Sequence, residues 1–402
     1  MISRRTALKL LAGGSATAVM ANGLRLAVAD APTERRFVLV ILRGGLDGLA
    51  SVPAYADPDY HAQRGSLAFD DPDAAEGALD LDGFFGLHPS LSALHGMFRA
   101  GELLVVHAVA TPYRSRSHFD GQNLLENGTA RVNGATDGWL NRALGLMSSE
   151  RQLGLAIGQS VPLVLRGPTP VGSWSPVQAL PAAGDDFLSR LATLYRDDLL
   201  FGPALTEAIR LQEMSDEIIG KQDTRRSRQD AKALTGVAES LARFLADPNG
   251  PRVAVLEAGG WDTHANQGLL TGRLAGRLAG LGEGLAVFKE ASGAIWRDTV
   301  VAVVTEFGRT VAVNGTGGTD HGTAGAVFLL GGAVAGGRVI ADWPGLSGDR
   351  LYGGRDLAPT TDLHAVWKSV LAWHLELPRD GIERIVFPGS AGVSALPDLI
   401  KT

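Results

Sequence analysis

The residues of this sequence that could do chemistry are carboxylates and histidines placed next to short apolar runs. They are Asp47, Asp262, His264, Glu306, Asp320 and His321. Carboxylate oxygens and neutral imidazoles are ligands of zinc, manganese and iron in proteins, and carboxylates also suit calcium. Glycines beside several of them let the backbone and a substrate come close. Ligands of this type in four separate loops predict a divalent metal site.

Taken alone, each of these loops has a simpler interpretation. Asp47 could be a helix cap, Glu306 and Arg309 could form a plain ion pair, and Asp320-His321 could form a plain turn. Asp262-Thr263-His264 is a stronger signal, because residues i and i+2 of an extended backbone point to the same side and can bind one ion. The convergence of four loops favours a metal or catalytic site over four independent structural roles.

The loop from Arg114 to Asp120 adds a candidate nucleophile. Ser117 lies where a helix is expected to begin, and the field of a helix N-terminus favours an alkoxide and its anionic ester. The alternative is that Ser117 merely caps the helix. Arg114 and Arg116 suit an oxyanion such as phosphate or sulfate. We therefore predict that Arg116 offsets charge on a transferred group, with His118 as a further candidate catalytic residue.

The strands that position these loops are visible as short apolar runs bounded by glycine. The runs are Phe37 to Leu42, Leu103 to Val109, Val253 to Leu256, Thr299 to Thr305 and Ala326 to Leu330. Strands buried on both faces have this composition, and helical patterns lie between several of the runs. We predict an α/β fold with a largely parallel central sheet flanked by helices. In such a fold the site lies just beyond the carboxyl ends of the strands.

Two further segments have helical spacing. Residues 185–247 combine this spacing with many charges, and we predict a helical insertion that forms a cap, although an ordinary solvated helical face would look the same. Asp362 to Leu377 predicts a helix with Asp362 in its first turn. His364 and His374 belong to the packing pattern of that helix and are interpreted as structural residues.

Composition excludes several classes of function. The net charge of -6 offers no basic surface, so nucleic acid is not expected as a partner. There are no cysteines, which excludes thiolate metal sites and cysteine nucleophiles. Apolar residues make up 45% of the chain and charged residues 20%, so nothing indicates disorder.

The first residues resemble a twin-arginine leader. Arg4 and Arg5 precede a weakly apolar run from Leu10 to Met20, and Ala27-Val28-Ala29 supplies small residues for cleavage. The run is shorter than the roughly 20 apolar residues that span a bilayer, which argues against a membrane anchor. We expect residues 1–29 to be removed after export by the twin-arginine translocase. A single α/β domain of residues 30–402, without a membrane span, would then reach the periplasm or be secreted.

Several motifs together resemble the bacterial DUF1501 family. They are Arg43-Gly44-Gly45-Leu46-Asp47-Gly48-Leu49, Ser117-His118-Phe119-Asp120, Gly260-Trp261-Asp262-Thr263-His264, Thr305-Glu306-Phe307-Gly308-Arg309-Thr310 and Asp320-His321-Gly322. The resemblance runs over essentially the whole chain after the leader. The family is placed with the alkaline phosphatase and sulfatase superfamily, so the resemblance implies an alkaline phosphatase-like fold more firmly than it implies a reaction.

The resemblance also implies roles for residues of this chain. Asp47 resembles a metal ligand after the first strand, and Ser117 lies near the position of the nucleophile. Asp262 and His264 resemble the pair that binds the other metal, and His321 resembles the late histidine of that site.

Two departures from the superfamily pattern concern the second metal site. Glu306 resembles the acidic ligand after the penultimate core strand, but Phe307 stands where a histidine usually follows it. The spacing from Asp262 to His264 is also shorter than usual. These departures predict an altered or empty second metal site, in which His118 could replace the missing imidazole.

The leading functional prediction is a metal-dependent periplasmic hydrolase of phosphate or sulfate esters, with a small molecule or a polysaccharide ester as substrate and one or two divalent ions. One alternative is a non-catalytic envelope or polysaccharide-associated protein with a degenerate metal site. A weaker alternative is an oxidoreductase with a single redox metal, since histidine and carboxylate also suit iron. The sequence predicts no oligomeric state.

Overall fold

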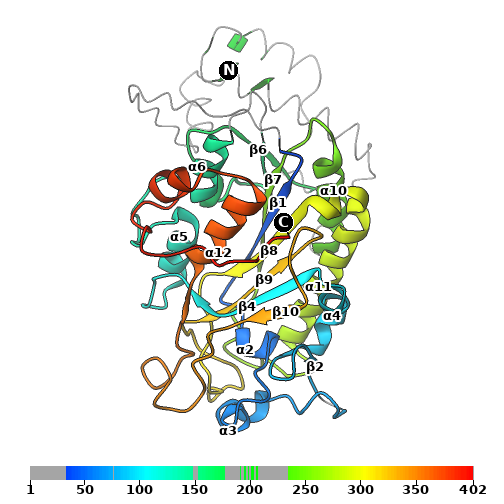
Figure 1. Ribbon diagram of the computed structural model, residues 1–402, viewed down its shortest axis with the longest axis vertical. Coiled ribbons are helices and arrows are strands. Elements are labelled where there is room, and N and C mark those ends of the chain that lie inside the picture. Colours follow the sequence, from blue (N-terminus) through cyan, green and yellow to red (C-terminus); the bar gives the residue numbers. More distant parts are fainter. Residues whose placement is uncertain are drawn as a thin grey trace, which may run out of the picture.

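The computed structural model describes residues 33–75, 77–147, 153–176 and 234–401, with isolated positions between 191 and 206 (Figure 1). Its centre is a nine-stranded sheet with the order β10-β4-β9-β8-β1-β7-β5-β6, in which β11 also pairs with β4. The strands are β1 (Arg36–Arg43), β4 (Leu103–Ala110), β5 (Gly154–Ile157), β6 (Val171–Trp174), β7 (Val253–Gly259), β8 (Thr299–Thr305), β9 (Gly325–Leu330), β10 (Arg338–Ile340) and β11 (Thr361–Asp362). All five predicted strands are therefore confirmed.

The direction of β9 differs from that of its neighbours. β9 pairs antiparallel with both β8 and β4, whereas the other strand pairs of this sheet are parallel. The predicted largely parallel sheet is thus confirmed, with one reversed strand. Because β9 is reversed, its amino end lies at the edge where the neighbouring strands have their carboxyl ends. The residues just before β9 consequently join the loops that follow β1, β7 and β8.

The central strands are apolar because both of their faces are covered. Along β1, Val38, Val40 and Leu42 belong to one hydrophobic cluster, whereas Phe37 and Leu39 belong to the other. Every residue of β8 is buried. Alternating side chains of a strand point to opposite faces, so a strand covered on both sides loses the alternation of apolar and polar residues.

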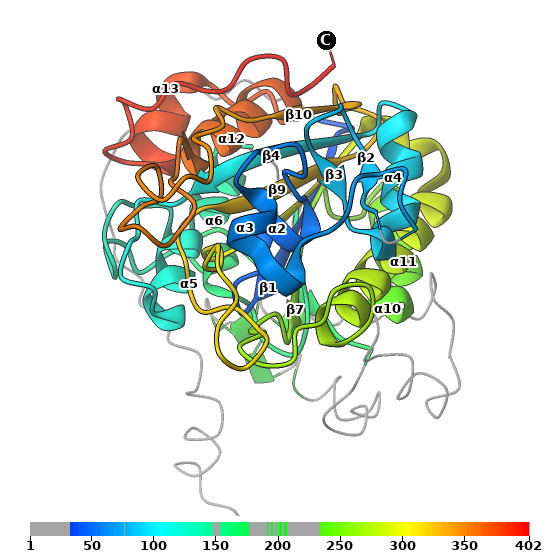
Figure 2. The same cartoon turned by 90° about the horizontal axis from the view of Figure 1, so that it is seen from below.

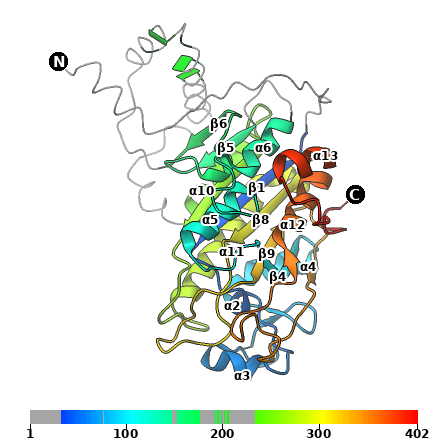
Figure 3. The ribbon, with the colours of Figure 1, turned by 90° about the vertical axis from the view of Figure 1, so that its left-hand side faces the viewer.

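Helices cover the two faces of the sheet (Figures 2 and 3). One face packs against α4 (Ser92–Arg99), α10 (Leu234–Ala246) and α11 (Arg273–Ser292). The other packs against α5 (His118–Asn127), α6 (Trp139–Leu146) and α12 (Leu363–Ser369). The predicted layers of helix, sheet and helix are confirmed.

Shorter elements complete the described chain. They are the α-helical turns α2 (Gly48–Ser51), α3 (Tyr60–Arg64) and α13 (Arg379–Gly381), the 3-10 turns η1 (Gly65–Leu67), η2 (Pro89–Leu91), η3 (Leu163–Leu165) and η4 (Gly293–Asp298), the π-helical turns η5 (Val370–His374) and η6 (Ile382–Val386), and the hairpin of β2 (Leu79–Asp80) and β3 (Gly86–Leu87).

The predicted C-terminal helix is present as α12 followed directly by η5. Asp362 caps it, because its side chain accepts a hydrogen bond from the backbone N–H of His364. His364 Nε2 lies 3.1 Å from the carbonyl oxygen of Gly128, and His374 Nε2 lies 2.8 Å from that of Arg36. Both rings are buried. These contacts agree with the structural interpretation of the two histidines.

Two predicted features fall wholly or largely outside the described residues. The leader at 1–29 is one, and most of the insertion at 185–247 is the other. The described end of that insertion, α10, packs on the sheet beside α11, with Leu241 and Phe244 in the core. Among the helices that the structure describes, none has the length and apolar character needed to cross a membrane.

Candidate metal centre

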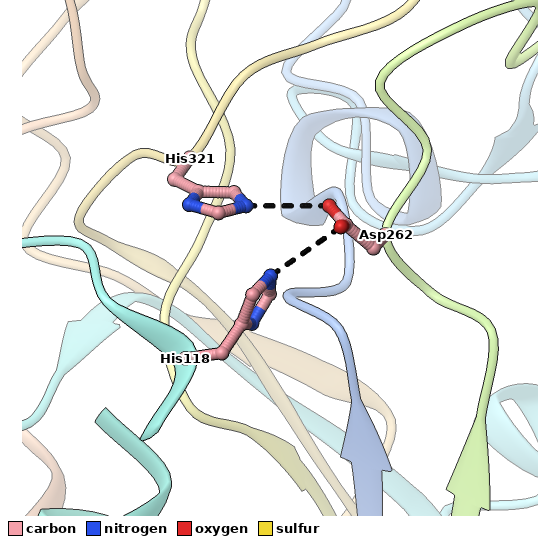
Figure 4. A group of neighbouring side chains, drawn as sticks. All are labelled: His118, Asp262 and His321. Carbon is pink, nitrogen blue, oxygen red and sulfur yellow. Dashed lines mark hydrogen bonds and ion pairs between the residues drawn. The ribbon is translucent and has the colours of Figure 1, made fainter. Parts of the chain in front are cut away.

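Three loops bring histidines and an aspartate together at the edge of the sheet where β7 ends and β9 begins (Figure 4). His118 is the first residue of α5, Asp262 and His264 follow β7, and His321 precedes β9. One ligand atom from each of His118, Asp262 and His321 lies within 4.8 Å of the others. The structure therefore has a candidate His/Asp metal site.

The distances within the cluster are those of ligands around one small ion. His264 Nε2 is 3.0 Å and His321 Nε2 is 3.3 Å from Asp262 Oδ1, and the two Nε2 atoms are 2.9 Å apart. His118 Nε2 lies 3.5 Å from Asp262 Oδ2. Ligands about 2.0–2.1 Å from a tetrahedral zinc ion are about 3.3 Å from one another. The cluster needs little rearrangement to bind such an ion.

The other ring nitrogen of each histidine is already bonded to an acceptor. His118 Nδ1 lies 2.7 Å from Glu306 Oε1, and His264 Nδ1 lies 2.9 Å from Asp320 Oδ1. His321 Nδ1 lies 2.9 Å from the carbonyl oxygen of Arg116. Acceptors of this kind require a proton on Nδ1, so each neutral ring directs the lone pair of Nε2 into the cluster. Metal-binding histidines have this arrangement.

These lone pairs lack donors within the described residues. His118 Nε2 is buried without a hydrogen-bond partner, and its 3.5 Å separation from Asp262 is too long for a good hydrogen bond. If both rings are neutral and carry their proton on Nδ1, His264 Nε2 and His321 Nε2 face each other at 2.9 Å as two acceptors. A divalent cation would satisfy all three atoms, so the residues present fit a metal ion.

The surroundings favour the metal-binding protonation states of Asp262 and His321, whereas they favour the protonated form of His118. Burial raises the pKa of Asp262, but hydrogen bonding and charge attraction from Arg309 outweigh it and hold that pKa below its usual value. Burial lowers the pKa of His321, which favours its neutral ring. The hydrogen bond to Glu306 raises the pKa of His118, so a proton competes with a cation there. The ligand side chains are 23% to 43% exposed, which leaves the cluster open to solvent.

Two of the predicted ligands lie behind the cluster rather than in it. Glu306 is buried and accepts hydrogen bonds from His118, from the backbone N–H of Gly44 at 2.9 Å and from Gln122 at 3.1 Å. Asp320 is bonded to Nδ1 of His264. Both carboxylates thereby orient rings that face the cluster. The plain ion pair of Glu306 with Arg309 is absent, because Arg309 donates to Asp262 Oδ1 at 2.7 Å.

The structure does not bring Asp47 into this cluster. Its side chain caps α2 by accepting from the backbone N–H of Ala50 at 3.0 Å. Its other oxygen accepts from Arg64 and from Gln267, each at 2.8 Å. Burial raises the pKa of Asp47, and Arg64 with Gln267 more than offsets this effect. The negative charge of this buried carboxylate is therefore already balanced by Arg64.

Ser117 and Arg116 lie beside the cluster. The hydroxyl of Ser117 makes no capping hydrogen bond, whereas the guanidinium of Arg116 is paired with a carboxylate. Ser117 is the half-buried N-cap of α5. The prediction that a helix begins at this serine is thus confirmed. Both Nε and Nη2 of Arg116 bind Asp356 Oδ2, at 2.7 and 2.6 Å. The predicted role of the Arg116 guanidinium on a transferred group finds no support, because a buried carboxylate already binds it.

The profile of a protein family described as "Protein of unknown function (DUF1501)" matches residues 34–386. The chain belongs to the DUF1501 family. The resemblance of its motifs is therefore confirmed over most of the chain. Comparison with curated proteins gives no significant match.

Solved structures similar to this DUF1501 chain include three from bacteria. The C-terminal periplasmic domain of EcEptC from Escherichia coli, in complex with Zn, aligns with TM-score 0.35 and 12% identity over 74% of this chain and 73% of that one. A sulfatase from Pseudoalteromonas sp. aligns with TM-score 0.33 and 12% identity over 76% and 64%. The phosphonate monoester hydrolase of Agrobacterium radiobacter aligns with TM-score 0.30 and 13% identity over 76% and 70%.

Sequence reasoning missed several residues that support the centre of this DUF1501 protein. Gln122 lies one helical turn after His118, so both reach Glu306, and the i, i+4 spacing could have predicted this. Arg64 binds Asp47, which lies 17 residues before it, and Asp356 binds Arg116, which lies 240 residues before it. No local pattern in the sequence predicts either pair.

Proposed function

We propose that this chain is a metal-dependent hydrolase of phosphate or sulfate esters. The observation that carries the proposal is the shared arrangement of His118, His264 and His321. Every Nδ1 is bonded to an acceptor, and every Nε2 lies beside Asp262. Four side chains from distant loops adopt this arrangement, which costs stability unless a cation balances the converging acceptors.

One divalent ion per chain is the proposed stoichiometry. His118, Asp262 and His321 would hold it, with His264 beside them. Such an ion would stabilise negative charge that develops on an ester during hydrolysis. A second ion bound by Asp47 is not proposed, because the hydrogen bonds from Arg64 and Gln267 occupy that carboxylate.

Ser117 is the proposed nucleophile. Its hydroxyl makes no hydrogen bond to the described residues, and it directly precedes His118 at the start of α5. Backbone N–H groups at a helix N-terminus favour negative charge nearby, which would stabilise both an alkoxide and its ester. The proposed substrates are phosphate or sulfate esters of small molecules or polysaccharides. The resemblance to the alkaline phosphatase and sulfatase superfamily supports this substrate class.

The proposed location is the periplasm or the cell exterior, reached through the twin-arginine pathway. Arg4 and Arg5 in the leader support this proposal. Export in a folded state would allow the metal to be bound inside the cell, where its supply is controlled.

Two competing proposals each have a specific observation in their favour. A non-catalytic envelope protein is favoured by the bonded states of Asp47 and Arg116, which leave neither free for a substrate. A single-metal oxidoreductase is favoured by the three imidazoles and one carboxylate, a donor set that iron also accepts. An absorption spectrum of protein as isolated distinguishes iron from zinc.

The test begins with elemental analysis of protein exported with its own leader. We expect one divalent ion per chain, and protein without stoichiometric metal would exclude the proposal. A screen of phosphate and sulfate esters then compares wild type with Ser117→Ala and with Ser115→Ala, a matched control at an exposed neighbouring serine. We expect Ser117→Ala to lose turnover while it retains metal. Turnover at the rate of the control would exclude Ser117 as nucleophile.

A further inference from the structure

We propose that Asp356 is a positioning residue that orients His321 through two arginines, and that Arg116 serves the metal centre with its backbone carbonyl rather than with its guanidinium. This inference rests on the proposed function only in taking His321 as a ligand. The contacts that carry it are all within the described residues.

Asp356 is fully buried and binds both arginines. Arg116 Nε donates to its Oδ2 at 2.7 Å, Arg116 Nη2 forms an ion pair with the same oxygen at 2.6 Å, and Arg355 donates to its Oδ1 at 2.9 Å. A buried carboxylate with two guanidinium partners is a strong, geometrically specific contact. Asp356 therefore fixes where both arginine chains run.

Each arginine then contacts His321 at a different point. The carbonyl oxygen of Arg116 accepts from His321 Nδ1 at 2.9 Å, and Arg355 donates to the carbonyl oxygen of His321. The contacts form a closed ring from Asp356 through Arg116 and His321 to Arg355 and back to Asp356. This closed set of contacts fixes both the backbone and the imidazole of His321.

The backbone conformation of Arg116 explains why this closed set of contacts is needed. Its φ is 62°, in the left-handed region that is unfavourable for a residue with a side chain. The hydrogen bond and the ion pair with Asp356 offset this cost. Without them the residue would relax toward ordinary backbone angles, and its carbonyl would turn away from His321.

His321 depends on this backbone more than the other two histidines do on theirs. The Nδ1 atoms of His118 and His264 are bonded to carboxylates, whereas that of His321 is bonded only to a peptide carbonyl within the described residues. Loss of the Arg116 carbonyl would free the tautomer and the orientation of the His321 ring. Partners of this kind change metal affinity about 10- to 100-fold.

The decisive experiment compares Arg116→Gly with Arg116→Ala. Both remove the guanidinium, but glycine adopts a positive φ without strain and keeps the carbonyl in place. Competition with a chromophoric chelator measures Zn²⁺ affinity. We expect Arg116→Ala to bind Zn²⁺ about 10- to 100-fold more weakly and Arg116→Gly to bind close to wild type. Equal losses in both variants, or no loss in Arg116→Ala, would overturn the inference.

A second measurement needs no metal and separates this inference from the proposed function. ¹⁵N NMR of metal-free protein reports which nitrogen of His321 carries the proton. We expect the Nδ1–H form in wild type and Arg116→Gly, and a mixture of tautomers in Asp356→Asn. A wild-type protein that binds no metal but keeps the Nδ1–H form refutes the proposed function alone. Unchanged Nδ1–H in a folded Asp356→Asn variant refutes the positioning role.

Discussion

Substituting Asp47 distinguishes a metal ligand from a structural carboxylate. Asp47→Asn keeps the side-chain volume and the oxygen that caps α2, but removes the negative charge opposite Arg64. Arg64 is 0% exposed and its Nη2 binds Asp47 Oδ2 at 2.8 Å. Removing one partner of a buried ion pair costs about 3–5 kcal/mol, because the remaining charge is left buried without compensation. We expect the free energy of unfolding to fall by an amount of this order.

Metal affinity should not follow that loss of stability. Urea denaturation measures the free energy of unfolding, and chelator competition on the folded variant measures Zn²⁺ affinity. The double variant Asp47→Asn/Arg64→Met is the control, because it removes both charges and should recover part of the lost stability. The reasoning is refuted if Asp47→Asn unfolds within about 1 kcal/mol of wild type while its metal affinity falls steeply. That result would make Asp47 a ligand, as the family resemblance implies.

Three further predictions follow from the contacts of individual histidines. His321→Ala should abolish tight Zn²⁺ binding measured by chelator competition, whereas His61→Ala, at an exposed histidine, should leave it unchanged; equal affinities in the two variants would remove His321 from the site. Glu306→Gln should weaken Zn²⁺ binding about 10- to 100-fold, because Glu306 orients His118, and unchanged affinity would contradict that role. Burial lowers the pKa of His374 to about 4 from 6.5, so the folded protein keeps this ring neutral while the unfolded chain binds a proton. Stability should therefore fall by about 2 kcal/mol on this account as the pH drops from 7.5 to 5, and His374→Gln should remove that part of the pH dependence in urea denaturation; an unchanged pH profile would count against it.

The central strands could be predicted from the sequence because burial on both faces leaves a direct mark on composition. Runs such as Phe37 to Leu42 and Thr299 to Thr305 contain almost no polar side chains, and the structure places both in the middle of the sheet. The direction of β9 has no such mark. Strand direction depends on pairing partners distant in sequence, so the apolar run alone does not reveal it.

The candidate site was predictable as a set of loops but not as a set of contacts. The types and spacing of Asp262, His264 and His321 sufficed to place them at one edge. Whether a carboxylate lies in the cluster or behind it depends on distances of a few ångströms set by tertiary packing. Asp320 therefore orients the imidazole of His264, and Asp47 forms an ion pair with Arg64, although both have the residue type of a metal ligand.

Crystallography with data collected at a metal absorption edge tests the central claim most directly. Crystals of the protein without residues 1–29, loaded with Zn²⁺, should show one anomalous peak per chain, within bonding distance of Asp262 and of Nε2 of His118 and His321. The Nδ1 atoms should keep their present acceptors. A peak beside Asp47, or no peak beside His118 and His321, would contradict the account.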